Sequence, residues 1–123
     1  MLKDVNQSNY SIIKDDAKKN VRIDIDGFFG PNDVNQYLKD YEALKKSIDV
    51  KSTTLILNGK DLKAFPNEVE ATLGELYKDY STFKKVYITT PTQLVTKMQV
   101  QRVLRSNNLA EHFEFVANVE DIK

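Results

Sequence analysis

Apolar and polar positions alternate along the first part of the chain with the period of a strand. Residues 21–26 (VRIDID) switch between apolar and polar at every position, which is typical of a strand with one buried face. Residues 10–14 (YSIIK) predict a short strand before it, and the Asp-, Lys- and Asn-rich residues 15–20 predict a turn between the two. The two strands should therefore form a hairpin, preceded by a polar tail over residues 1–9.

Two stretches carry apolar residues at the spacing of an amphipathic helix. The first follows a turn at residues 27–31, whose Pro31 suits a first helical turn, and its apolar positions are Val34, Tyr37, Leu38, Tyr41, Leu44 and Ile48. The second follows Pro66 in the same way, and its apolar positions are Val69, Leu73, Leu76, Tyr77 and Tyr80. The tyrosines on these faces predict core packing. A close contact between helix and sheet would explain Gly74 inside the second helix.

A third helix follows, and its start has two readings. Thr92 can cap it, or Thr96 can cap it in a capping box with Gln99 three residues later. Its buried face consists of Val100, Val103 and Leu104. The helix should end at residues 107–108, because asparagine suits the left-handed position that follows many helices.

Further strands are predicted at residues 53–57, 84–90 and 113–117, with a final turn at 119–122. The element order is therefore β-β-α-β-α-β-α-β, with the final turn as a possible last helix. Strands separated by helices pair in parallel through right-handed crossovers. The sequence thus predicts an α/β fold, a single domain over residues 10–123 with an open mixed sheet.

Composition narrows the class of protein. The 123 residues suit one domain, and 41% hydrophobic with 29% charged residues is typical of a globular chain. Lys plus Arg equals Asp plus Glu at 18 each, so no net field favours nucleic acid or an anionic membrane. The chain has no cysteine, which excludes disulfides and thiolate chemistry and suits a reducing compartment. Its start lacks an apolar signal region, and its apolar runs fall short of the roughly 20 residues of a membrane span. We therefore expect a cytoplasmic protein without membrane insertion.

Three stretches give the chain a family resemblance. Residues 26–44 (DGFFGPNDVNQYLKDYEAL) end a strand in a glycine-containing turn before a helix. Residues 54–65 (TLILNGKDLKAF) and 101–122 (QRVLRSNNLAEHFEFVANVEDI) follow, over nearly all of the remaining fold. Together they resemble the STAS family, the small α/β domains of bacterial anti-sigma-factor antagonists that also occur on sulfate transporters. The resemblance implies a STAS-like fold and a non-enzymatic, regulatory function through protein–protein contact.

The chain departs from the family at the phosphorylation site. Family antagonists carry a serine at the start of the second helix, which the partner kinase phosphorylates. Alignment on Leu55, Leu57 and Gly59 places residues 64–67 (AFPN) there, without a hydroxyl. The nearest candidates are Thr53, Thr54 and Thr72. We therefore expect binding that no phosphorylation switches. Residues 90–98 also exceed the family's short turn by about one helical turn.

The resemblance places the partner-binding surface at the loop of residues 58–67 and the turn of residues 27–33. The predicted partner-binding residues are Gly30, Asn32, Lys60, Asp61, Lys63, Phe65, Asn67 and Glu68. An exposed Phe65 would anchor a partner, whereas a buried one would plug the end of the sheet. The expected partner is an anti-sigma-factor-like kinase or another regulator. The Tyr10 strand, as a sheet edge, would allow a homodimer.

Other chemistries receive less support from the residues. Lys60 and Lys63 at a helix start could hold an anion, but no phosphate-binding glycine motif accompanies them. His112 is the only histidine, so a zinc site or a hydrolytic triad has no visible partners for it. The acidic residues at strand and helix ends suit capping better than catalysis, namely Asp24, Asp26, Asp61 and Glu68. We expect no catalytic residue, metal or cofactor. The alternative function is binding of a lipid or nucleotide between sheet and helices.

Overall fold

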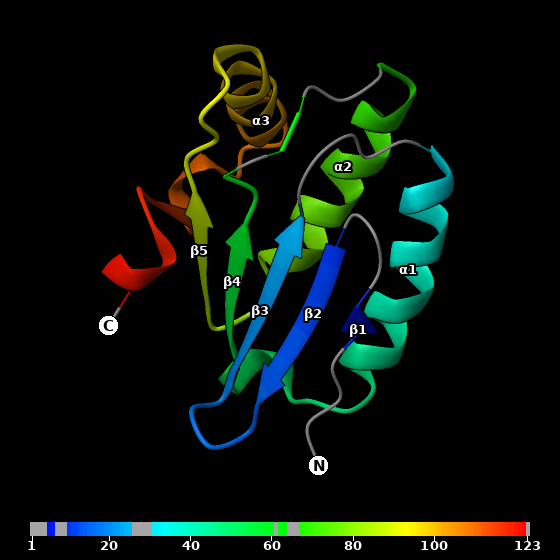
Figure 1. Cartoon of the computed structure of the whole chain (residues 1–123), viewed down its shortest axis with the longest axis vertical. Coiled ribbons are helices and arrows are strands. Elements are labelled where there is room, and N and C mark those ends of the chain that lie inside the picture. Colours follow the sequence, from blue (N-terminus) through cyan, green and yellow to red (C-terminus); the bar gives the residue numbers. More distant parts are fainter. Residues whose placement is uncertain (1–4, 7–9, 26–30, 61, 64–66, 123) are drawn as a thin grey trace.

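The structure is a computed structural model, and it describes residues 5–6, 10–25, 31–60, 62–63 and 67–122. Within these ranges, six strands form one sheet in the order β1-β2-β3-β4-β5-β6 (Figure 1). Their bounds are β1 Val5–Asn6, β2 Tyr10–Asp15, β3 Asn20–Ile25, β4 Thr54–Asn58, β5 Lys85–Thr89 and β6 Phe113–Val116. The pairs β1–β2 and β2–β3 are antiparallel, and β3 to β6 are parallel. The predicted α/β fold with an open mixed sheet is confirmed.

In the described part of the chain, three α-helices connect the parallel strands, namely α1 Pro31–Lys45, α2 Asn67–Tyr80 and α3 Leu94–Ser106. Short 3-10 turns complete the chain at η1 Val50–Ser52, η2 Ala110–His112 and η3 Val119–Asp121. Because the strands follow one another across the sheet in chain order, right-handed crossovers bring the helices to the same face. In Figure 1 the strands pass in front of α2. None of the helices in the described ranges has the length and apolar run that a membrane crossing needs.

The core lies between the helices and one face of the sheet. Alternate strand residues face it, and the pairing register aligns Val21, Leu55, Val86 and Phe113 in one row across the sheet. The next row along the strands, Arg22, Ile56, Tyr87 and Glu114, points to the opposite face. The period-two pattern of residues 21–26 therefore marked the buried face correctly, as far as Ile25, where the description stops.

Among the described residues, five tyrosines are buried where α1 and α2 meet the sheet, namely Tyr10, Tyr37, Tyr41, Tyr77 and Tyr80. The helical spacing predicted this burial for all of them except Tyr10, which lies in β2. The hydroxyls of Tyr37 and Tyr80 share a hydrogen bond of 2.5 Å. The hydroxyl of Tyr41 donates to Asp79, which also accepts from Lys45, so α1 and α2 are joined at their ends. These bonds satisfy hydroxyls that would otherwise be buried without partners.

The start of the chain differs from the sequence expectation. Within the segment predicted as a tail, Val5 pairs with Ile12 and Asn6 with Ser11, which gives the short strand β1. Strand β2 is therefore flanked on both sides at these two positions, and it is not the sheet edge predicted for a homodimer. Two residues of pairing contribute little to a hydrophobic pattern, so no period in the sequence could signal β1.

Helix α3 also begins elsewhere than the two predicted starts. Gln93 is the N-cap residue, without a side-chain bond to the helix. Thr92 instead donates its hydroxyl to the backbone oxygen of Lys60, while Thr96 lies inside the first turn and is fully buried. The predicted C-terminal end is confirmed, because Asn108 has a left-handed φ of 58°.

Gly74 makes its close contact with α3 and not with the sheet. A Cβ at Gly74 would lie 2.9 Å from the side-chain nitrogen of Asn107, the C-cap residue of α3. That nitrogen donates to the backbone oxygen of Val103 at 2.8 Å, so its position is fixed. A side chain at position 74 would therefore require the Asn107 side chain to move, and glycine avoids this conflict between the two helices.

Candidate functional site

The carboxyl ends of the parallel strands lie together at one end of the sheet, where ligands and partners of open α/β folds usually bind. Strands β4 and β5 are tied to each other at this end. The Gly59 backbone nitrogen donates to the hydroxyl of Thr89 at 2.9 Å, and this hydroxyl is 3.3 Å from the side-chain oxygen of Asn58. The loop after β4 thus starts from a fixed position.

Lys60 joins three loops at this end. Its backbone oxygen accepts hydrogen bonds from the nitrogen and hydroxyl of Thr92, at 3.0 and 3.1 Å, in the loop before α3. Its side-chain nitrogen donates to the side-chain oxygen of Asn118, at 2.6 Å, in the loop after β6. The Lys60 ammonium therefore has a neutral partner inside the protein. This contact weakens the interpretation of Lys60 as an anion-binding residue.

Leu62 anchors the same loop to the core. Its backbone nitrogen donates to the oxygen of Gly59 at 3.1 Å, which closes a turn, and its side chain is buried in the core cluster. From the sequence, Phe65 was the residue predicted to plug the end of the sheet if it were buried. Leu62 fills that role among the described residues, whereas Phe65 lies outside them.

The structure describes some of the predicted partner-binding residues and not others. Asn32 at the start of α1 and Lys63 after the turn are exposed, and Lys60 is half-buried. Asn67 and Glu68 are the first two residues of α2, and their side chains lie outside the description. Outside it altogether are Gly30, Asp61 and Phe65.

An exposed apolar cluster that the sequence analysis missed lies on the first turns of α3. Leu94 is 68% exposed, Val95 60% and Met98 58%, and we call these three residues the α3 apolar cluster. Leu94 follows Thr92 by two residues, so the cluster adjoins the loop that carries Lys60 and Lys63. A signal was present, since residues 94, 95 and 98 are apolar yet lie off the face formed by Val100, Val103 and Leu104.

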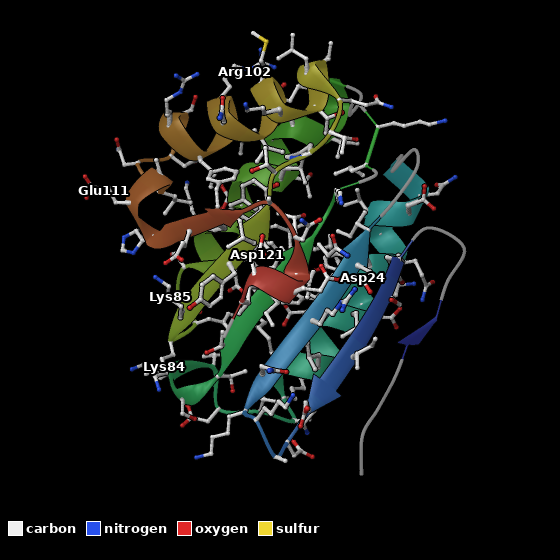
Figure 2. All side chains as sticks on the ribbon, turned by 60° about the vertical axis from the view of Figure 1, so that its left-hand side comes forward. Asp24, Lys84, Lys85, Arg102, Glu111 and Asp121 are labelled. Atoms are coloured by element: carbon white, nitrogen blue, oxygen red, sulfur yellow. The ribbon has the colours of Figure 1, made fainter. Side chains whose placement is uncertain are left out.

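The charges on α3 are all positive. The helix carries Lys97, Arg102 and Arg105 and no acidic residue. Arg102 binds both carboxylate oxygens of Glu70 on α2 at 2.8 Å, and this hydrogen bonding lowers the pKa of Glu70 below its ordinary value. Figure 2 shows Arg102 on α3 at one extremity of the molecule, with side chains of this helix projecting away from the sheet.

A cavity between sheet and helices bears on the alternative function. It has a volume of about 40 Å³ and an almost wholly apolar lining that includes Leu57, Leu62 and Tyr80. Pockets for drug-sized ligands usually measure roughly 300–1,000 Å³. The described structure therefore offers no room there for a lipid or a nucleotide.

A larger concavity lies on the face of the sheet away from the core. It has a volume of about 680 Å³, and we call it the open-face groove. Its floor includes Arg22, Ile56 and Tyr87, and Val119 and Ile122 line it from the chain's last turn. Figure 2 shows that turn, η3, in front of the sheet. The groove is wide enough for a small ligand, and its lining mixes apolar side chains with charges of both signs.

The residues considered for other chemistry are dispersed. The Asp24 carboxylate pairs with Arg22 at 2.9 Å, and His112 is exposed at the end of η2. Within the ranges that the structure describes, no group of three or more His, Cys, Asp or Glu residues is placed to hold a metal ion. Asp26 and Asp61, which the sequence analysis also weighed, lie outside those ranges.

Comparison of the chain with protein-family models found no match, and neither curated proteins nor solved structures matched it. The resemblance to STAS domains rests on the three sequence stretches and stays a prediction.

Proposed function

We propose that this chain is a protein-binding, regulatory domain similar to the anti-sigma-factor antagonists of the STAS family. In this proposal it binds its partner in the bacterial cytoplasm with the surface at the carboxyl ends of β4 to β6. The observation that carries the proposal is the α3 apolar cluster beside the predicted loop. The proposal assigns no catalytic residue and no cofactor.

The exposure of the cluster argues for a binding role. Single apolar side chains on a surface are ordinary, whereas adjacent ones commonly mark an interaction site. Leu94, Val95 and Met98 are the most exposed large apolar residues in the described part of the chain, and they lie within five positions of one another. Burying such side chains against a partner removes apolar surface from water, and the free energy gained favours association.

Binding in this proposal needs no phosphorylation. Residues 64–67 offer no hydroxyl, and the threonines that the sequence suggested as alternatives lie in unsuitable places. Thr72 is a half-buried residue of α2, Thr53 is buried, and Thr54 begins β4 at the opposite end of that strand. Incubation with cellular kinases should leave Thr53, Thr54 and Thr72 without phosphate. Stoichiometric phosphate on any of them would contradict the unswitched version, since residues 60–70 contain no Ser, Thr or Tyr to modify.

Affinity capture with a matched pair of variants tests the proposal. The tagged wild type should enrich a specific protein from a lysate of its own cells, and Leu94→Asp should reduce the recovery on the order of tenfold, as loss of an interface anchor does. Ile13→Asp is the control, because Ile13 is exposed apolar surface in the open-face groove. Both variants must melt as the wild type does. Equal recovery with Leu94→Asp and wild type would exclude the α3 apolar cluster from the binding surface, and no enrichment at all would contradict the proposal.

The open-face groove favours a second candidate function, the binding of a small ligand. The site predicted from the sequence for such a ligand lies between sheet and helices, where the cavity is too small. A ligand that binds only the folded chain raises its melting temperature in proportion to RT ln(1 + [L]/Kd). A nucleotide or lipid that raises the melting temperature of wild type but not of Tyr87→Ala would support this candidate, and an unchanged melting temperature across the screen would reject it.

A further inference from the structure

The α3 apolar cluster is surrounded by positive charge alone on its own helix. Lys97 lies between Val95 and Met98, and Arg102 and Arg105 follow within two turns. Exposed Lys63 belongs to the adjoining loop, which Thr92 ties to the start of α3. Arg102 is already paired with Glu70, so Lys97 is the charge closest to the cluster that lacks a described ion pair.

The cluster is held on a rigid and projecting support. The opposite face of α3 is anchored in the core by Val100, Val103 and Leu104, so the helix cannot roll its apolar residues inward without losing that burial. None of the three cluster residues lines the cavity or the open-face groove. A convex helical face of this kind is suited to enter a groove and not to receive a peptide.

We propose that the first two turns of α3 insert into an apolar groove with an acidic rim on the partner protein. This inference rests on the proposed function and adds the binding element and the chemistry of its partner. The side chains of Leu94, Val95 and Met98 fill the groove. Lys97, with Lys63 beside it, meets the acidic rim, since opposite charges across an interface select the partner and speed the encounter.

An anionic membrane offers the same apolar and acidic chemistry, and two observations favour a protein. Helices that lie in a membrane surface bury an extended apolar face, whereas this cluster covers little more than one turn. Membrane attraction also depends on several basic residues near the surface. Here the chain as a whole has no net charge, and one of the three basic residues of α3 is neutralised by Glu70.

The test uses the partner recovered by wild-type capture, produced in pure form, and measures association with the full-length chain. Lys97→Glu should slow association and weaken binding on the order of tenfold, and Lys97→Gln should weaken it less, because reversal adds repulsion to the loss of attraction. Raising the salt concentration should weaken partner binding by the wild type more than partner binding by Lys97→Glu. Lys18→Glu makes the same charge change at a residue that lines the open-face groove, and it serves as the control.

A photo-crosslinking residue at position 98 locates the contact directly. It should attach to an apolar segment of the partner that is flanked by Asp or Glu, whereas the same residue at position 13 should not.

Equal binding by wild type, Met98→Asp and Lys97→Glu, together with loss on Lys63→Glu or Phe65→Asp, would overturn this inference and leave the proposed function standing. Tighter binding by Lys97→Glu would contradict the proposal that the partner's groove has an acidic rim. Crosslinking to lipid alone, with flotation on phosphatidylserine vesicles, would overturn the protein partner and with it both proposals.

Discussion

The side-chain nitrogen of Lys60 donates a hydrogen bond of 2.6 Å to the side-chain oxygen of Asn118, which lies 58 positions further along the chain. This contact closes the carboxyl end of the sheet, because it joins the loop after β4 to the loop after β6. The surface proposed for partner binding is thereby built on three connected loops, each fixed to the next by bonds to Lys60.

Removal of the Lys60 ammonium should destabilise the fold. Lys60→Met keeps the alkyl chain and the cap that Asn118 provides for η3, and it deletes only the donor. A hydrogen bond with one charged member contributes about 1.5 kcal/mol when buried, so we expect a loss of about 1 kcal/mol at this half-buried position. Urea unfolding measures it, with Lys63→Met as the exposed control. Equal stability of the two variants would show that the Lys60–Asn118 bond contributes nothing.

The buried hydroxyl of Thr96 should destabilise the fold, and its replacement should therefore increase stability. Thr96 is fully buried, and within the described structure its hydroxyl has no hydrogen-bond partner. Thr96→Val replaces the hydroxyl with a methyl group of similar size, so the free energy of unfolding should rise by about 1 kcal/mol. Thr92→Val makes the same chemical change where the hydroxyl is bonded to Lys60, and it should lower the free energy. A loss of stability on Thr96→Val would mean that the hydroxyl has a partner.

Gly74 and Asn107 should be coupled. Alanine in place of glycine inside a helix normally gains about 1 kcal/mol, but a Cβ at Gly74 would meet the Asn107 side chain at 2.9 Å. Gly74→Ala should therefore gain little or lose stability in the wild type, and it should gain about 1 kcal/mol in an Asn107→Ala background. The four unfolding free energies of this double-mutant cycle give the coupling directly. If the effects of the two substitutions on the unfolding free energy are additive, residues 74 and 107 do not contact each other.

Several features of this molecule were readable in the sequence, and others depend on contacts across the fold. The buried faces of β3, α1 and α2 follow directly from the spacing of their apolar residues. The bond between Lys60 and Asn118 leaves no local pattern, because it forms only when the parallel strands align. The start of α3 was mispredicted because Thr92 and Thr96 both fit a capping pattern, while the fold uses one hydroxyl for the Lys60 loop and buries the other.

The family resemblance led to the loop after β4, where the structure places Lys60 and Lys63, and the role of this loop in partner binding stays a prediction. The α3 apolar cluster was missed because the sequence prediction considered only the buried face of this helix, although residues 94, 95 and 98 lie off that face. The burial of Val100 and Leu104 and the exposure of Leu94 and Met98 establish the orientation of the helix.

The buried tyrosines should make stability fall at high pH. Burial raises the pKa of each of them above the ordinary 10.0, namely Tyr10, Tyr37, Tyr41, Tyr77 and Tyr80. The folded chain holds their protons above pH 10 whereas the unfolded chain releases them, so the free energy of unfolding should be unaffected by them below pH 10 and decrease above it. Near-ultraviolet tyrosinate absorbance and circular dichroism should change together. Ionisation of these five residues before unfolding would contradict their burial.

The central claim is that the carboxyl end of the sheet binds a partner protein through the start of α3. Hydrogen exchange of the chain, alone and with its purified partner, tests it most directly, because amides under an interface exchange more slowly. The account predicts slower exchange on binding in residues 58–63 and 92–98, with no phosphorylation required and with the β2–β3 turn unchanged. Slower exchange confined to residues 13–22 and 119–122 would place the binding site in the open-face groove and contradict the account.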